Sequence, residues 1–267
     1  MKKTALASAL FATVLFAASS VHAAPLIVNT TLSNISTAFD NVITGTGSTV
    51  ATAQVVTGVN TYNYIDKDGN AATVTVTRPN GSTPSFYGNY GSNGISLSGS
   101  SWNINPGTSA GEPIPYFNSG LTFTFSSPVN AFGFEVGDWA TCCTSVVRDA
   151  NTVSTYGVPA QGSGLWIAFD GGAATLPANA LSASDNPGYA ASESYTNFIG
   201  AIDSSGFFSK VTFFGDGFGE VLVAGGTLRF ASVPKGSVGG SVPEPASLAL
   251  LGIGLAGLAT MRRRKAA

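Results

Sequence analysis

Apolar side chains in the middle of the chain alternate with polar ones, which is the spacing of a strand buried on one face. Leu121, Phe123 and Phe125 are separated by threonines, and an alternation of period two predicts a β-strand. Similar runs predict strands at 48–56, 62–65, 73–77, 131–136, 165–169, 198–202, 210–214, 220–223 and 227–230. Turn-forming stretches rich in Asp, Gly, Ser and Asn separate several of them. With no amphipathic helix of ordinary length between these runs, the pattern predicts an all-β fold, an antiparallel β-sandwich of jelly-roll type.

The pattern also divides the chain into segments. The predicted strands fall within a body at 24–234, in which the stretch 79–119, rich in Gly, Ser, Pro and Asn, is the least regular part. An inserted loop region or a second lobe there remains open. Residues 235–241 contain three glycines and are typical of a flexible linker.

The first 23 residues have the composition of a signal peptide. Lys2 and Lys3 precede an apolar run at 5–18, and Val21 and Ala23 occupy the −3 and −1 positions of a cleavage site. The run is shorter than the ~20 residues that a spanning helix needs. We therefore expect a signal helix at 1–23 that signal peptidase removes after Ala23.

The last 26 residues combine prolines, an apolar run and a basic end. Prolines break structure ahead of the apolar stretch 248–261, and the basic cluster after it is typical of a stop-transfer segment whose charges stay cytoplasmic. The proline-containing stretch is Val242, Pro243, Glu244 and Pro245, and the basic cluster is Arg262, Arg263, Arg264 and Lys265. The segment 242–267 thus predicts a hydrophobic helix that holds the precursor in the inner membrane, with the body on the opposite side from the cytoplasm.

These three parts, in this order, resemble the tail of the PEP-CTERM family of exported bacterial proteins. The resemblance covers about 25 residues and implies recognition of 242–245 by an exosortase, in a Gram-negative bacterium that makes exopolysaccharide. It implies an inner-membrane-anchored precursor facing the periplasm, and then release to the cell surface or extracellular matrix. A plain anchor that is never cut is the alternative.

Short motifs in the body resemble those of many PEP-CTERM proteins, whose bodies look like lectin-type or carbohydrate-binding sandwiches. The motifs are Ser127-Pro128-Val129, Ala131-Phe132-Gly133, Phe198-Ile199-Gly200 and Val211-Thr212-Phe213. The Asp-Asp or Asp-Asn pair often found near the last strand of such bodies is absent around Thr227. A metal or ligand site that depends on that pair is therefore not implied.

Charge and histidine content exclude several kinds of function. Residues 24–242, the body with its linker, have six basic and 13 acidic residues, a net charge of −7, which argues against nucleic acid or an anionic membrane as a partner. The one histidine, His22, lies in the signal peptide. A mature protein without histidine cannot form a Ser-His-Asp or Cys-His nucleophile system or a histidine-ligated zinc site.

Acidic residues near the ends of predicted strands are candidate ligands for Ca²⁺. They are Glu135, Asp138, Asp170, Asp216 and Glu220, several of them beside glycines. Carboxylate oxygens on loops at one rim of a sandwich could hold Ca²⁺, which takes six to eight oxygen ligands. The alternative is that these residues only form turns.

Aromatic side chains in polar, Gly-rich surroundings are candidates for stacking on sugar rings. Trp102, Trp139 and Tyr189 fit this description, with packing in the core as the alternative for each. Cys142 and Cys143 are the only cysteines. Export favours oxidation, and the options are a vicinal disulfide, an intermolecular bridge or free thiols.

These observations favour a non-enzymatic surface or matrix protein that contacts extracellular polysaccharide. A self-assembling structural protein is one alternative. A carbohydrate-active hydrolase is another, since glycoside hydrolysis needs only two carboxylates about 5 to 9.5 Å apart. Its candidate acids are Glu112, Glu135, Glu193 and Glu220.

Overall fold

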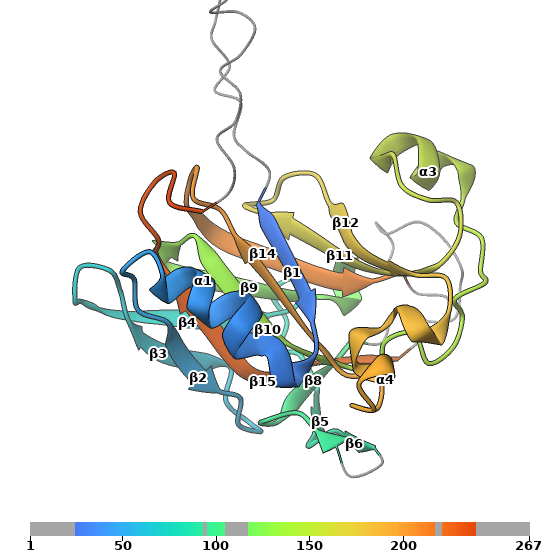
Figure 1. Cartoon of the computed structure of the whole chain (residues 1–267), viewed down its shortest axis with the longest axis horizontal. Coiled ribbons are helices and arrows are strands. Elements are labelled where there is room, and N and C mark those ends of the chain that lie inside the picture. Colours follow the sequence, from blue (N-terminus) through green and yellow to red (C-terminus); the bar gives the residue numbers. More distant parts are fainter. Residues whose placement is uncertain (1–24, 93–94, 105–116, 217–220, 239–267) are drawn as a thin grey trace, which may run out of the picture.

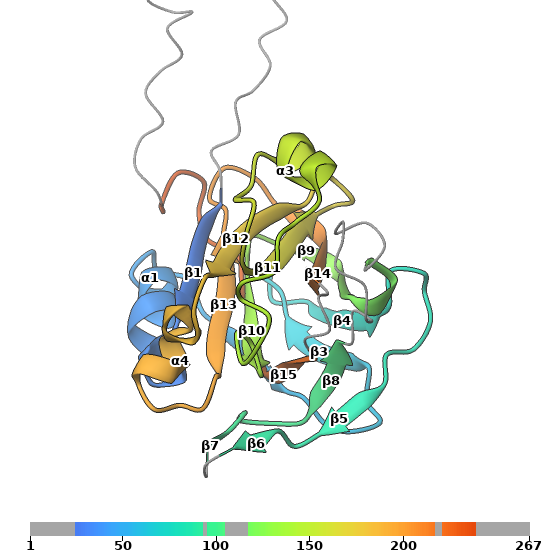
Figure 2. The same ribbon diagram turned by 90° about the vertical axis from the view of Figure 1, so that its right-hand side faces the viewer.

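The alternating segments form two antiparallel sheets in the computed structural model, which describes residues 25–92, 95–104, 117–216 and 221–238. The expected signal helix, the C-terminal hydrophobic helix and the sorting motif lie outside the described residues. Figure 1 shows the body along its shortest axis, and Figure 2 shows it turned by 90°. The expected all-β sandwich is confirmed.

Each sheet is built from strands that are distant in the sequence. Sheet A has the order β1 (Leu26–Thr30), β13 (Asn197–Ile202), β10 (Ala131–Gly137), β15 (Leu222–Ala231), β8 (Ser101–Ile104) and β5 (Phe86–Gly88), with β2 (Ala51–Gln54) also paired to β15. Sheet B has the order β12 (Thr175–Ala180), β11 (Ser163–Phe169), β14 (Phe208–Gly215), β9 (Leu121–Val129), β4 (Ala71–Thr77) and β3 (Thr61–Ile65). A small hairpin joins β6 (Gly91–Ser92) and β7 (Ile95–Ser96).

Aromatic side chains from both sheets fill the space between them. Phe123 of sheet B lies 4.7 Å from Phe132 and 5.1 Å from Phe134 of sheet A, centroid to centroid. Phe134 in turn meets Phe213 of β14 edge to face at 4.8 Å. All four rings are almost completely buried. Alternation on β9 and β10 therefore directs these side chains into one shared core.

The strand boundaries differ from the sequence prediction in a few places. The two runs predicted at 220–223 and 227–230 belong to one long strand, β15, which continues through Gly225 and Gly226. The register shifts between Gly133 and Glu135, where residues 226–228 of β15 lie opposite a single residue of β10. Such a bulge accommodates extra residues without ending the pairing. The sequence pattern also missed β1, β12 and the short strands between 86 and 104.

The expectation that the body lacks an amphipathic helix of ordinary length is wrong for one segment. Successive turns η1 (Leu32–Asn34), η2 (Ser36–Asp40) and α1 (Asn41–Thr44) make a helical segment on the outer face of sheet A. Ile35, Phe39 and Ile43 are buried there. In an α-helix, residues four apart are rotated by about 40° relative to each other around the helix axis. The wider π-type turns of η2 reduce this rotation, which keeps the three side chains on the same face.

Two glycines of the short motifs let this outer cluster approach sheet A. Gly133 and Gly200 are direct cross-strand partners, and a Cβ on Gly200 would lie 2.8 Å from atoms of both Phe39 and Phe198. The rings of Phe39 and Phe198 lie 5.0 Å apart, edge to face. Both glycines therefore leave space for an aromatic pair that fixes the helical segment to the sheet.

The remaining helices are short and lie outside the two sheets. They are η3 (Phe117–Ser119), α3 (Ala150–Tyr156), η4 (Ala183–Asp185) and α4 (Pro187–Ala190). Among the helices within the described ranges, none is long and apolar enough to cross a membrane.

The register of sheet A defines two ends of the sandwich. Leu26 pairs with Ile202, and Ala131 pairs with both Ile202 and Ala231. We call this the tail end, because the body's first strand begins here and its last strand finishes here. At the opposite end, the loop end, Gly137 pairs with Val223, and α4 and β6 lie on this side (Figure 1).

Candidate functional site at the loop end

Two loops of sheet A contact each other at the loop end. The first loop comprises residues 138–162, between β10 and β11, and includes α3. The second loop comprises residues 186–196, directly before β13. The backbone N–H of Trp139 donates to the carbonyl of Tyr195 at 3.3 Å, and the Asn186 side chain donates to the Trp139 carbonyl at 2.7 Å. Adjacent strands thus deliver two loops that hold each other in place.

Backbone strain is concentrated in these loops. Seven non-glycine residues of the described chain have positive φ, and six of them are here. They are Asp138 (65°), Ala140 (65°) and Cys143 (64°) in the first loop, and Ser192 (61°), Ser194 (53°) and Tyr195 (58°) in the second. Left-handed conformations of such residues cost of order 1 to 3 kcal/mol each and cluster at functional sites. Ala140 and Tyr195 have no side chain that favours this conformation locally.

A disulfide between neighbouring cysteines closes part of the first loop. The structure joins Cys142 to Cys143, whose Cα atoms are 3.8 Å apart. Cys142 is exposed and Cys143 is half-buried. Of the options left open by the sequence, the structure therefore has the vicinal bridge.

Four tyrosines lie on or beside the two loops. Tyr87 and Tyr189 are 54% and 47% exposed. The ring of Tyr87 lies 6.5 Å from that of Tyr90, and the ring of Tyr189 lies 5.4 Å from that of Tyr195. The Tyr90 hydroxyl donates to the Ser194 carbonyl at 3.4 Å, which joins the β5–β6 region to the second loop. Each exposed tyrosine offers an apolar ring face and a hydroxyl group.

Burial changes the acidity of two groups at this site. It raises the pKa of Tyr90 to about 12, with a further contribution from the negative charge of Asp138. Burial also raises the pKa of the Asp138 carboxyl above its ordinary value. The Tyr90 hydroxyl therefore keeps its proton at neutral pH.

The structure places only one of the three candidate sugar-stacking residues on the surface. Trp102 is completely buried and donates its indole N–H to Asn60 Oδ1 at 3.0 Å. Trp139 is 1% exposed and packs in the core between the sheets. The expectation that these two rings stack on a ligand is wrong, because both are buried in the main hydrophobic core. Tyr189 is exposed, as a ligand-stacking role requires.

The five candidate Ca²⁺ ligands do not form one rim. Glu135 is buried and accepts from the backbone N–H groups of Ser98 and Thr227. Asp170 caps a tail-end turn by accepting from the backbone of Ser209 and Lys210. Asp138 lies in the first loop, Asp216 pairs with an arginine, and Glu220 lies outside the described residues. Within the described ranges, no three His, Cys, Asp or Glu side chains are grouped as a metal ion would need.

The described candidate acids for glycoside hydrolysis also have backbone partners. Glu193 accepts from the N–H groups of Leu32 and Ser33 at 2.6 and 3.1 Å, and so connects the second loop to η1. Glu135 bonds to Ser98 and Thr227 as described. Glu112 and Glu220 lie outside the described residues.

A buried ion pair connects the first loop to sheet B. The Arg148 and Asp216 side chains are 0% and 2% exposed, and their charged atoms meet at 2.5 Å. The arginine also donates to the carbonyls of Pro159, Gln161 and Gly162 at 2.8, 3.1 and 3.0 Å. One guanidinium group therefore connects the chain segment before α3 to the segment after it.

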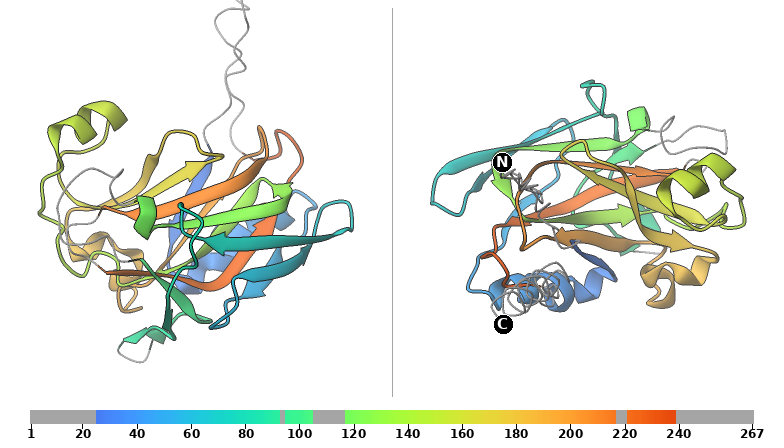
Figure 3. Two further views of the ribbon diagram at one scale, coloured as in Figure 1. Left: turned by 180° about the vertical axis from the view of Figure 1, so that it is seen from behind. Right: turned by 90° about the horizontal axis from the view of Figure 1, so that it is seen from above.

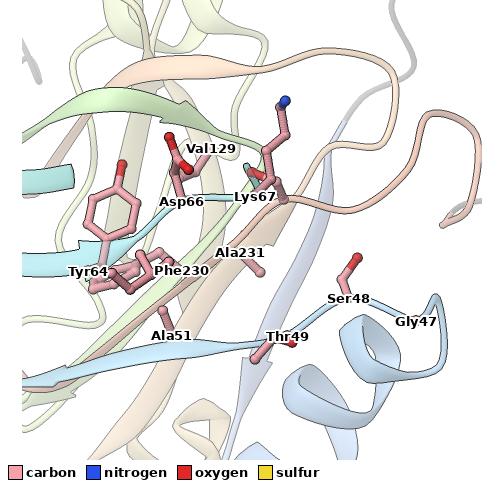
Figure 4. Close-up of a pocket in the computed structure, with 12 residues that line it drawn as sticks. Gly47, Ser48, Thr49, Ala51, Tyr64, Asp66, Lys67, Val129, Phe230 and Ala231 are labelled. Carbon is pink, nitrogen blue, oxygen red and sulfur yellow. The ribbon is translucent and has the colours of Figure 1, made fainter. Parts of the chain in front are cut away.

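A separate cavity of about 440 Å³ opens at the tail end, beside α1 (Figure 4). Tyr64, Ile65, Asp66 and Lys67 line it on one side. The remaining lining residues are Gly47, Ser48, Thr49, Ala51, Val129, Phe230, Ala231 and Ser232. Its charged groups already have local partners, since Asp66 accepts from the backbone of Asp68 and Asn70, and Lys67 pairs with Asp68. This cavity lacks the strained backbone that marks the loop end.

Sequence reasoning missed most of the loop-end site. Tyr87 and Tyr90 fall in the irregular stretch 79–119, for which the pattern predicts no strand. The residues around Tyr195 carry no pattern that predicts its contact with Trp139. Pairs of closely spaced tyrosines in a Gly-rich stretch were the available signal.

Fold and site together define an all-β sandwich whose loop end has two mutually hydrogen-bonded loops and exposed tyrosines. The PEP-CTERM protein-sorting motif matches residues 241–265 of this chain. Comparison with curated proteins and with solved structures gives no match. The chain thus carries a PEP-CTERM sorting motif, which supports an exported protein that an exosortase sorts towards the cell surface of a Gram-negative bacterium.

Proposed function

We propose that the body is a non-catalytic module that binds extracellular polysaccharide at the loop end. The observation that carries the proposal is the pair of strained, mutually bonded loops with exposed Tyr87 and Tyr189 beside them. Strained residues persist only where the surrounding structure fixes them. A rigid site loses little conformational entropy when it binds a ligand.

The chemistry of the site favours a neutral or weakly charged saccharide. Tyrosine rings can stack on the apolar faces of sugar rings, and their hydroxyls can hydrogen-bond to the sugar. The net charge of −7 on residues 24–242 disfavours strongly anionic polymers. The loop end also lies opposite the tail end, so a body held through its tail presents this face to its surroundings (Figure 1).

The proposal includes the route by which the body arrives. Signal peptidase would remove residues 1–23, and the segment 242–267 would hold the precursor in the inner membrane with its body in the periplasm. Exosortase would then cut at the sorting motif and release the body to the surface or matrix.

Binding to purified exopolysaccharide and to a glycan array tests the proposal. Replacing Tyr87 or Tyr189 with Ala should weaken binding about tenfold each, corresponding to about 1.4 kcal/mol. Phe207→Ala is the matched control, because Phe207 is an aromatic residue of similar exposure (49%) at the tail end. Binding without release of new reducing ends is the expected result. Equal binding by the tyrosine variants and the wild type would assign the function elsewhere, and release of sugar ends would show a hydrolase.

A further inference from the structure

The chain stays bonded to the body up to residue 238, although the composition of residues 235–241 predicts a flexible linker. Gly236 donates its N–H to the Ser204 carbonyl at 2.9 Å, and the Ser204 hydroxyl donates to the carbonyl of Val238. Val238 also packs against the apolar cluster beneath the helical segment. The expectation of a flexible linker at 235–241 is therefore wrong for its described part, which is bonded to the loop after β13.

The segment just before this attachment is held firmly as well. Asn130 accepts from the Val233 N–H at 2.7 Å and donates to the Val233 carbonyl at 2.9 Å. Both Asn130 and Val233 are buried. This two-bond contact fixes the chain immediately after β15, so the body's folded structure continues to Val238.

Only three residues, Gly239, Gly240 and Ser241, separate Val238 from the sorting motif. Even a fully extended chain spans no more than about 14 Å between the Cα atoms of Val238 and Val242. That length is little more than the diameter of one α-helix with its side chains, about 10 to 12 Å. A sorting enzyme whose active site encloses 242–245 must therefore touch the tail end of the folded body.

The surface at the tail end is suited to a protein contact. Ile65 is 62% exposed at the end of β3 and lines the cavity that also contains Ala231 and Ser232. Phe207 is 49% exposed and lies in the loop whose Ser204 holds the tail. Exposed apolar side chains around a hollow are common where another protein docks.

We propose that the tail end, with Ile65 and Phe207 and the cavity between β3 and β15, is a docking surface for exosortase. The folded body would then be part of the substrate, in addition to the sorting motif. This inference rests on sorting by exosortase, but it does not depend on saccharide binding at the loop end.

The test is the rate at which the full-length precursor is processed in a host that makes the exosortase. Inserting about twelve Gly and Ser residues after Val238 separates the body from the motif by a flexible coil. The insertion touches no residue of the body, so it tests the proposal even if surface variants fold poorly. We expect the insertion to slow conversion about fivefold or more, equivalent to about 1 kcal/mol. Conversion at the wild-type rate, or faster, would overturn the proposal.

Surface variants locate the contact. Ile65→Ser and Phe207→Ser should each slow conversion, whereas Leu181→Ser should not, because Leu181 is similarly exposed (59%) but follows β12 at the end of sheet B away from Phe207. Equal rates for all three would overturn the assignment of the surface. If the mature protein instead binds phosphatidylethanolamine and phosphatidylglycerol vesicles and Phe207→Ser abolishes this binding, the surface contacts lipid and the exosortase assignment fails. A wild-type precursor that is never cut would overturn processing itself, a different result from normal cutting of the insertion variant.

Discussion

Replacing Arg148 with Met removes the cation that joins the first loop to sheet B. Asp216 would keep a buried carboxylate whose other described hydrogen bond comes from the indole N–H of Trp166, at 2.5 Å. Three backbone carbonyls at 159–162 would each lose one hydrogen bond at the same time, although that of Gln161 would keep the bond from the Asn179 amide at 3.1 Å. Removing one partner of a buried ion pair costs about 3 to 5 kcal/mol. We therefore expect Arg148→Met to lower the free energy of unfolding by about 4 kcal/mol.

Asp216→Asn is the matched perturbation from the other side. Arg148 would keep its bonds to the three carbonyls and its contact with Asn179. The buried guanidinium then lacks its counter-charge, but because these neutral acceptors remain, we expect a loss at the lower end of the range for a broken buried ion pair, about 3 kcal/mol. The double variant should be no less stable than Arg148→Met alone, because once the arginine is absent the buried charge of Asp216 is itself unfavourable.

Urea unfolding of the purified mature protein at neutral pH measures these differences. The expected order of stability is wild type, then Asp216→Asn, then Arg148→Met. If Asp216→Asn were the more destabilising change, the arginine's bonds to the loop carbonyls would contribute little. If Arg148→Met cost less than about 1 kcal/mol, the pair would behave as a surface salt bridge and would not hold the loop.

Three further predictions follow from individual contacts. Asp138→Asn should raise the melting temperature at pH 7, where the burial that raises the Asp138 pKa penalises the ionised carboxylate. The gain should shrink as the pH falls through the raised pKa and should be lost below the ordinary carboxyl pKa, where both states are protonated; a constant difference across pH would refute this reasoning. Gly200→Ala should destabilise the protein by about 1 to 3 kcal/mol through overpacking against Phe39 and Phe198, whereas Gly171→Ala, in an exposed turn with positive φ, tests backbone strain without a clash. Millimolar Ca²⁺ should leave the melting temperature of metal-stripped protein unchanged, since the described candidate ligands are not grouped; a clear rise would show a cation site.

Strand positions were determined largely by the sequence itself. Alternation at Leu121, Phe123 and Phe125 is enough to define β9, because a strand has the same two faces whatever lies opposite. Figure 3 shows the strands of the sandwich from behind and from above. Glycine and aspartate between the runs likewise mark the turns, since their backbone preferences are local. The sorting motif is also a property of the sequence alone, because an enzyme recognises it as a linear segment.

Which of two residues in similar surroundings reaches the surface was decided only by the tertiary structure. Trp102 and Tyr189 both occur in polar, Gly-rich surroundings, yet one is covered by the opposite sheet and the other is exposed. The sequence presents Glu135 as a candidate metal ligand, but in the structure its carboxylate accepts a hydrogen bond from the Ser98 N–H. The strained contact between Trp139 and Tyr195 joins residues 56 positions apart. Burial and contact of this kind depend on which strands become neighbours, and strand order is a long-range property that local periodicity does not contain.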